Sequence, residues 1–236
     1  SHLSLDHLGG HYPRGYRGFA LQLIGKVPAQ SLVFLGAPAS GKGTQGRRLA
    51  EFGGFSYLST GGLLRTALRQ GTALGKEARP FLDRGEYVPD EVMLPMVIEW
   101  LGALKGAAIL DGFPRTLAQA EALDTAYLEM GHPLPHSVFL DVPDEELRRR
   151  VTGRLECVSC HWVTSRGAFE VCSKCGGKMA PRADDEVVRF ENRLNEFERL
   201  TFPLVRFYEE RGRLTLIEAL GSPEDIHTEL RLKILL

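Results

Sequence analysis

The sequence predicts an α/β protein in which a parallel β-sheet carries helices on both faces. Short apolar runs alternate with longer helical patterns, and a glycine-bearing turn joins the first apolar run to the first helical stretch. One segment, residues 155–183, breaks this alternation and holds all four cysteines. Strands that alternate with helices favour parallel pairing, because a helical crossover returns the chain to the same end of the sheet.

Five apolar runs are predicted as strands, at residues 31–35, 55–58, 107–110, 137–141 and 214–218. Between and after them, helices are predicted at residues 42–52, 63–70, 89–104, 117–130, 144–151, 184–200 and 223–236. The helix from residue 184 is amphipathic, with apolar side chains at steps of three and four. Pro203 is expected to end or kink it. Ser222 is predicted to cap the last helix, with Pro223 at its first position.

The composition is that of a folded globular protein and excludes a disordered or collagen-like chain. Of the 236 residues, 43% are hydrophobic and 25% are charged, as is usual for compact domains. The formal net charge is −1, so no bulk attraction to nucleic acid or to a membrane surface follows. A local basic cleft is still compatible with that balance.

No apolar run approaches the roughly 18 residues that a transmembrane helix requires. Residues 1–10 also lack the apolar stretch of a secretory signal. We therefore expect a cytoplasmic protein that binds neither nucleic acid nor membrane. Residues 1–30 carry a single acidic residue, Asp6. They are interpreted as a poorly ordered tail, with a transit-peptide remnant, a local extension or a cloning remnant as alternatives.

The turn after the first predicted strand has the pattern of a phosphate-binding loop. It reads GAPASGKGTQ over residues 36–45, and its place between a strand and a helix is the context that such a loop requires. Backbone N–H groups and the helix N-terminus favour an anion there. Lys42 would face the β- and γ-phosphates, and Thr44 would supply the hydroxyl near Mg²⁺. The candidate phosphate-binding residues are Gly36, Ala39, Ser40, Gly41, Lys42, Gly43 and Thr44.

The four cysteines form two CxxC pairs, Cys157 with Cys160 and Cys172 with Cys175, separated by eleven residues. Two such pairs suit one tetrahedral Zn²⁺ with four thiolate ligands. Such an ion stabilises a small insert that lacks a core of its own, and four cysteines leave no coordination position for a substrate. Reduced cysteines or disulfides are the structural alternative, and a zinc ribbon that binds nucleic acid is the functional one.

Three motifs together resemble the adenylate kinases of the bacterial long-lid type. These are GAPASGKGTQ at residues 36–45, Ser59-Thr60-Gly61, and DGFPRT at residues 111–116. The likeness runs from about residue 31 to the C-terminus. It implies a P-loop kinase core with two inserts, an AMP-binding helical domain and a zinc-stapled lid. It also implies reversible transfer of the γ-phosphoryl group from Mg-ATP to AMP, which gives two ADP.

The resemblance assigns charged residues to the phosphate groups. Arg65 matches an arginine that holds the AMP phosphate, and Arg115 matches one near the transferred group. Asp111 ends a predicted buried strand, where a carboxylate acts on Mg²⁺ directly or through water, although an Asp that caps the following turn would look the same. No side chain is assigned as a general base.

Further arginines are assigned to the lid and its hinge. Arg150 and Arg154 match hinge arginines, the first against adenine and the second on the ATP phosphates. Arg182 and Arg193 match a pair that closes over both phosphate tails. Guanidinium groups bind phosphate oxygens bidentately, so lysine would not replace them without loss. The catalytic set is therefore Lys42, Asp111, Arg115, Arg154, Arg182 and Arg193.

The resemblance also assigns the residues that would read the acceptor base. Thr60 and Gln119 match positions that read adenine, and residues 86–88 match a segment that offers backbone contacts. A kinase for UMP or CMP is the nearest alternative. Gly62 stands where the family usually has Asp. The AMP-binding candidates are Thr60, Gly61, Arg65, Glu86, Tyr87, Val88, Gly112, Phe113, Arg115, Gln119, Arg182 and Arg193.

The expected organisation follows from these matches. The core would comprise residues 31–58, 89–153 and 186–236, with an AMP-binding insert at 59–88 and a lid at 154–185. Residues 1–30 lie outside the resemblance. It implies a monomer whose partners are the small molecules ATP, AMP and ADP.

Overall fold

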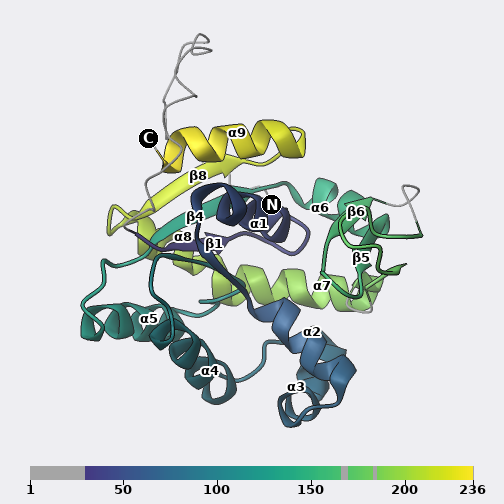
Figure 1. The fold of residues 1–236 in the computed structure, drawn as a ribbon, viewed down its shortest axis with the longest axis horizontal. Coiled ribbons are helices and arrows are strands. Elements are labelled where there is room, and N and C mark those ends of the chain that lie inside the picture. Colours follow the sequence, from purple (N-terminus) through teal and green to yellow (C-terminus); the bar gives the residue numbers. More distant parts are fainter. Residues whose placement is uncertain (1–29, 166–169, 183–184, 236) are drawn as a thin grey trace.

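The computed structural model describes residues 30–165, 170–182 and 185–235. Its centre is a parallel five-stranded sheet in the order β2-β3-β1-β4-β8 (Figure 1). The prediction of a parallel sheet is confirmed, and each predicted strand lies within one or two residues of its place. The strands are β1 (Leu32–Leu35), β2 (Ser56–Ser59), β3 (Ala108–Asp111), β4 (His136–Asp141) and β8 (Leu214–Glu218).

Helices cover both sides of this sheet. α1 (Lys42–Gly53) and α9 (Pro223–Ile234) pack together on one side, and α8 (Pro203–Glu209) lies on the other, with α4 (Asp90–Gly102) and α5 (Leu117–Glu129) beyond it (Figure 1). The inner strands β1 and β3 are buried along their whole length, as expected for strands covered on both faces.

The sequence signals at the start of the last helix act as predicted. The Ser222 side chain accepts a hydrogen bond from the backbone N–H of Asp225, and Pro223 occupies the first helical position of α9. The Thr116 side chain caps α5 in the same way, through the N–H of Gln119. Both caps satisfy amide donors that the first turn of a helix leaves unpaired.

The segment between β2 and α4 contains one helix that the sequence pattern did not reveal. α2 (Thr60–Gln70) was predicted from residue 63, but α3 (Ala73–Arg84) was not predicted. Glycine and proline within α3 are poor helix formers, so the sequence pattern did not predict a helix there. Gly75 packs against α2 so closely that a Cβ would lie 2.2 Å from the carbonyl oxygen of Ala67, and Pro80 lies within the helix despite its missing N–H.

The long helix predicted from residue 184 is divided in two. Its predicted first residue lies outside the described part of the chain, and α7 runs over Val187–Glu196. A π-helical turn, η2 (Phe197–Thr201), then leads into α8 at Pro203. Because proline clashes with the carbonyl four residues earlier in an α-helix, the turn widens, and the N–H of Phe202 bonds the oxygen of Phe197 at 2.8 Å. Pro203 thus alters the helix as expected.

The cysteine-bearing segment folds as a small antiparallel sheet, which the sequence pattern did not predict. Its strands are β5 (Arg154–Cys157), β6 (Val163–Ser165) and β7 (Met179–Ala180), in the order β6-β5-β7. β5 follows directly from α6 (Asp144–Thr152). In Figure 1 this small sheet lies beside the end of α7, near α2 and α3. These three strands carry too little apolar patterning to be recognised.

Candidate functional site

A cavity of about 700 Å³ opens at the carboxyl ends of the parallel strands. This edge is where ligands bind in open α/β sheets, because the loops after the strands meet there. The lining comes from the turn after β1, the ends of β2 and β3, α6, α7 and the small sheet. Ten Lys and Arg side chains and three Asp and Glu side chains line it. Their formal charge of +7 contrasts with −1 for the whole chain.

The turn after β1 has the backbone that its glycines predict. Gly36 has φ of +147°, and a Cβ there would lie 2.6 Å from the Ser40 hydroxyl oxygen and 2.9 Å from the Leu140 carbonyl oxygen. Gly41, with φ of +100°, precedes the first residue of α1. A larger residue at position 36 would disturb the loop. The loop and the N-terminus of α1 therefore face the cavity together.

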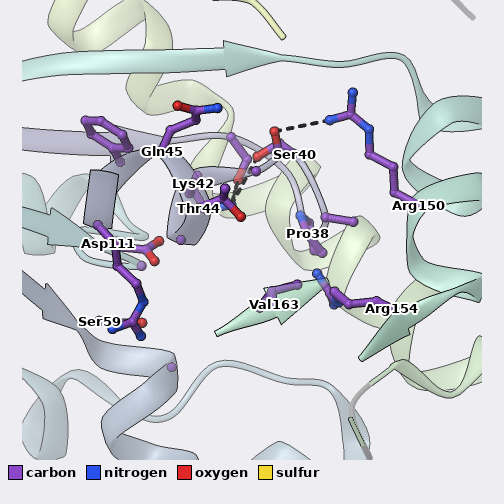
Figure 2. A pocket seen from close by; sticks show the side chains of 18 of the residues that line it. Pro38, Ser40, Lys42, Thr44, Gln45, Ser59, Asp111, Arg150, Arg154 and Val163 are labelled. Carbon is purple, nitrogen blue, oxygen red and sulfur yellow. Dashed lines mark hydrogen bonds between the residues drawn. The ribbon is translucent and has the colours of Figure 1, made fainter. Parts of the chain in front are cut away.

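Lys42 lies inside this turn, as Figure 2 shows. Its ammonium group donates hydrogen bonds to the carbonyl oxygens of Gly36 at 2.5 Å and Ala37 at 2.8 Å. Burial lowers the pKa of Lys42 from 10.5 to about 7; Asp111 opposes this shift, whereas Arg193, Arg115 and Arg154 add to it. An anion beside Lys42 would restore its positive charge.

Asp111 lies at the end of β3, opposite the phosphate loop (Figure 2). Its carboxylate oxygen Oδ2 accepts a hydrogen bond from the Tyr57 hydroxyl at 2.7 Å. A Cβ on Gly43 would lie 3.5 Å from the same oxygen, so the carboxylate lies against the first turn of α1. Both Asp111 and Thr44 line the cavity, and their oxygens are the kind of ligand that Mg²⁺ prefers.

Two of the predicted arginines bond backbone oxygens, and one of them, Arg150, also pairs with the Glu146 carboxylate at 2.7 Å. Arg150, from α6, donates to the carbonyl oxygen of Ala219 at 2.7 Å and to that of Ser40 at 3.4 Å, the second bond being drawn in Figure 2. The Arg115 side chain donates to the carbonyl oxygen of Gly112 at 2.7 Å, and its guanidinium carbon lies 4.5 Å from the centre of the Tyr87 ring. These contacts aim both groups along the cavity wall.

The other predicted arginines pair with carboxylates. Arg154 forms two hydrogen bonds with Asp185, and Arg193 lies 3.8 Å from the same carboxylate. Arg65 and Arg182 both lie near the Glu156 carboxylate, at 3.3 Å and 3.4 Å respectively.

Most of the predicted site residues meet in this one cavity. Those that line it are Gly36, Ala39, Ser40, Gly41, Lys42, Gly43, Thr44, Gly61, Arg65, Tyr87, Asp111, Gly112, Arg115, Arg150, Arg154, Arg182 and Arg193. Five others do not line it. They are Thr60, Glu86, Val88, Phe113 and Gln119.

These five residues have structural partners instead. Thr60 is buried and donates to the carbonyl oxygen of Gly112 at 2.9 Å. Gln119 accepts from the backbone N–H of Arg115 at 2.7 Å and donates to Asp90 at 2.5 Å. Glu86 pairs with Arg84, whereas Val88 and Phe113 are buried. In this arrangement Thr60 and Gln119 fix the wall that carries Arg115.

The sulfur atoms of the four cysteines lie together, all within 4.8 Å of one another. Cys157 and Cys175 are 3.5 Å apart at sulfur, and Cys160 and Cys172 are 3.6 Å apart. Zn–S bonds of about 2.3 Å in a tetrahedron separate the sulfurs by about 3.8 Å, whereas a disulfide needs about 2.05 Å. The cluster therefore fits a four-thiolate metal, and all four cysteines are free.

Two functional neighbours, Tyr57 and Glu156, were missed from the sequence. Only Tyr57 had such a signal, because residues two apart on a strand share a face and β2 was predicted whereas β5 was not. Tyr57 stands two residues before Ser59 on β2, and Glu156 two residues after Arg154 on β5. Burial alone would raise the pKa of Glu156, but Arg65, Arg182 and His161 outweigh that effect and lower it.

Comparisons with known proteins agree with this geometry. The family model described as adenylate kinase matches residues 34–213. The chain belongs to the adenylate kinase family. An adenylate kinase of Thermodesulfovibrio yellowstonii is 45% identical over 84% of this chain and 96% of its own length. Adenylate kinases of Dehalococcoides mccartyi and Bacillus pumilus are each 39% identical, over 83% and 85% of this chain and 94% and 96% of their own lengths.

The family membership confirms the resemblance drawn from the three motifs. It also accords with the fold, since the parallel sheet, the flanking helices and the loop after β1 are those of a P-loop kinase. Members of the family are phosphotransferases. Within the described part of the chain, no helix has the length and apolar character needed to cross a membrane.

Proposed function

We propose that this protein transfers the γ-phosphoryl group of Mg-ATP to AMP, reversibly, to give two ADP. The observation that carries the proposal is the gathering of the phosphate loop and six arginines around one cavity with a formal charge of +7. Two nucleotides with adjoining phosphate chains bring a large negative charge into one place, and a cavity of this kind neutralises it.

The donor would bind along the phosphate loop. Backbone N–H groups of residues 36–44 and the N-terminus of α1 would hold the β- and γ-phosphates, with Lys42 beside them. Arg150, which already spans Ser40 and Ala219, would face the adenine, and Arg154 the phosphates. Thr44 and Asp111 would hold the Mg²⁺ of the donor, directly or through water.

The acceptor would bind between α2 and the end of β3. Arg65 and Arg115 line this part of the cavity and would hold its phosphate. Arg182 and Arg193 would close over both phosphate chains. Thr60, Gln119 and residues 86–88 remain our candidates for reading the adenine, although the side chains of Thr60 and Gln119 have protein partners in this structure.

The chemistry requires positioning and charge neutralisation. An oxygen of the AMP phosphate attacks the γ-phosphorus in line, a new P–O bond forms, and the bond from that phosphorus to the β–γ bridging oxygen breaks. Lys42, Arg115 and Arg154 would stabilise the charge that develops on the transferred group and on the leaving ADP. The acceptor oxygen is already anionic, so no general base is assigned.

Three parts of the chain would divide these tasks. We assign the core to residues 31–58, 89–153 and 186–236, the acceptor-binding insert to residues 59–88 and a lid to residues 154–185. Closure of the lid and insert would exclude water, which would otherwise accept the phosphoryl group. The small sheet that carries Arg154 and Glu156 beside the cavity supports this division.

The four cysteines would hold a structural Zn²⁺ in the lid. Their sulfur spacing supports this assignment. Free cysteines also fit a reducing compartment, so we propose a cytoplasmic location. We further propose that the protein acts as a monomer on ATP, AMP and ADP, without nucleic acid.

An assay with Mg-ATP and a panel of AMP, UMP, CMP and GMP tests the proposed function. We expect rapid, AMP-selective formation of ADP, and formation of ATP and AMP when ADP is the sole nucleotide. Transfer to UMP or CMP would keep the phosphate machinery and overturn the assignment of Thr60 and Gln119. No transfer to any acceptor, with metal bound and the fold intact, would favour a zinc ribbon that binds nucleic acid.

A further inference from the structure

The side chain of Glu156 brings a negative charge into the substrate cavity. It lies on β5 and is 5% exposed. One carboxylate oxygen, Oε2, lies 3.3 Å from an Arg65 nitrogen and 3.4 Å from an Arg182 nitrogen. The other, Oε1, lies 2.7 Å from Nδ1 of His161. Three cationic or hydrogen-bonding groups therefore converge on one buried carboxylate.

The partners of Glu156 come from two separate inserts. Arg65 lies on α2, whereas Glu156, His161 and Arg182 belong to the cysteine-bearing segment. His161 extends the link, because its Nε2 lies 3.0 Å from the Thr66 hydroxyl on α2. The backbone of His161 has φ of +60°, a conformation that residues other than glycine rarely adopt. The packing between the inserts holds it there.

A carboxylate offers the same recognition as a phosphate, since both present two or more anionic oxygens to a guanidinium fork. Arg65 and Arg182 are two of the arginines that the proposed function gives to the nucleotide phosphates. Glu156 thus lies where a phosphate group would find its partners. A carboxylate held 3.3–3.4 Å from Arg65 and Arg182 weakens the attraction of these arginines for a phosphate group.

We propose that Glu156 is an internal competitor of the acceptor's phosphate group. It pairs with Arg65 and Arg182, as in this structure, and gives them up when a nucleoside monophosphate binds. The exchange also breaks the ion pair that joins α2 to the cysteine-bearing segment, so phosphate binding loosens one tie between the two inserts. Glu156 thereby sets the affinity for the acceptor. This inference rests on the proposed function, because it takes AMP as the acceptor.

The test compares the wild-type chain with Glu156→Gln. Glutamine keeps the size of the side chain but removes the charge. We expect the dissociation constant for AMP, measured by NMR titration without ATP, to fall about tenfold, or about 1.4 kcal/mol. Affinity for adenosine, which lacks the phosphate, should change less than about twofold. A merely structural role for Glu156 would change both affinities together.

Glu191→Gln is the matched control, because it removes one negative charge from an exposed ion pair with Arg148, away from the cavity lining. It should leave AMP affinity unchanged. Melting temperature and bound metal establish that each variant is folded. If the Glu156→Gln variant loses its metal, the same NMR titration is made with the Glu156→Ser variant, which also removes the charge.

Unchanged or weaker AMP binding in the folded Glu156 variant would overturn the inference. So would an equal gain for adenosine, or an equal gain in Glu191→Gln. A wild-type chain that binds no AMP but binds another monophosphate would instead overturn the proposed acceptor. The same comparison made with that nucleotide and its nucleoside would still decide the role of Glu156.

Discussion

Lys42 occupies the centre of its own loop, where its ammonium group bonds the carbonyl oxygens of Gly36 and Ala37. The position is prepared for an anion, because a phosphate would stabilise the protonated form of Lys42 and would meet the N–H groups of the same turn. We predict that Lys42→Ala lowers kcat by about 100-fold or more while the melting temperature does not fall. Rates measured with Mg-ATP and AMP check this prediction, and near-normal turnover would remove Lys42 from the catalytic set.

The lowered pKa of Lys42 predicts a dependence of ATP binding on pH. With a pKa of about 7 in the free protein, Lys42 is largely neutral at pH 8. Bound polyphosphate raises that pKa, so binding takes up a proton and affinity falls as the pH rises above 7. The slope should approach tenfold per pH unit. Calorimetry at pH 8 in two buffers of different ionisation enthalpy measures the uptake, which Lys42→Ala should lose.

The same shift has the opposite effect on folding. The pKa of Lys42 is lower in the folded protein than its ordinary value of 10.5, so between pH 7 and 10.5 the unfolded chain binds more protons. The contribution of this group to the free energy of unfolding therefore rises with pH across that window. Nucleotide affinity and stability should consequently move in opposite directions from pH 7 to 9.

Residues carried by motifs were predictable from the sequence, whereas their partners were not. The phosphate loop and Asp111 are fixed by local patterns at the end of a strand, and both line the cavity. Tyr57 and Glu156 depend on which segments lie opposite them in space. Tyr57 meets Asp111 across two neighbouring strands, and Glu156 meets Arg65 across 91 positions of sequence.

At the scale of elements, the alternation of short apolar runs with helical patterns decided what could be predicted. All five strands of the central sheet lie within one residue of their predicted places, both the fully buried β1 and β3 and the partly exposed β2 and β8. α3 and the strands of the small sheet did not appear. α3 carries Gly75 and Pro80, and the small sheet depends on its cysteines more than on apolar periodicity.

The small sheet packs around few buried residues. Cys157, Cys172 and Met179 form its apolar cluster, which is too small to stabilise the segment alone. We predict that Cys172→Ser removes most of the bound zinc and lowers the melting temperature by about 5 °C or more. Turnover should fall less steeply than in Lys42→Ala. Metal analysis and thermal melts measure both effects.

A chelator supplies the control for that variant. It should lower the melting temperature of the wild-type chain and leave that of Cys172→Ser nearly unchanged. Equal melting temperatures of the wild-type and variant chains, without chelator, would show that the cysteines hold no stabilising metal. In that case the short sulfur distances would reflect packing of four thiols.

For the whole molecule, the contacts between α2 and the small sheet predict a kinetic pattern. The Thr66 hydroxyl on α2 lies 3.0 Å from Nε2 of His161 in the cysteine-bearing segment, a contact that does not involve the Arg65–Glu156 pair. We expect this contact to persist with nucleotides bound and to open before the products leave. We predict that opening limits turnover, so rapid-quench experiments should show a burst of product faster than the steady state. A single-turnover rate equal to kcat, without a burst, would place the limit in the chemical step.

The charge of the cavity has a consequence for how fast substrates arrive. A chain whose net charge is −1 attracts or repels a charged nucleotide little at long range. The residues that line the cavity nevertheless carry a formal charge of +7. Its field reaches about a Debye length into solution, roughly 8 Å at physiological ionic strength. Diffusing nucleotides are turned toward the opening only at the last stage of their approach. Added salt should therefore slow capture of ATP and ADP, while the rest of the chain, whose formal charge of −8 balances the cavity's +7 to the net −1, repels larger polyanions.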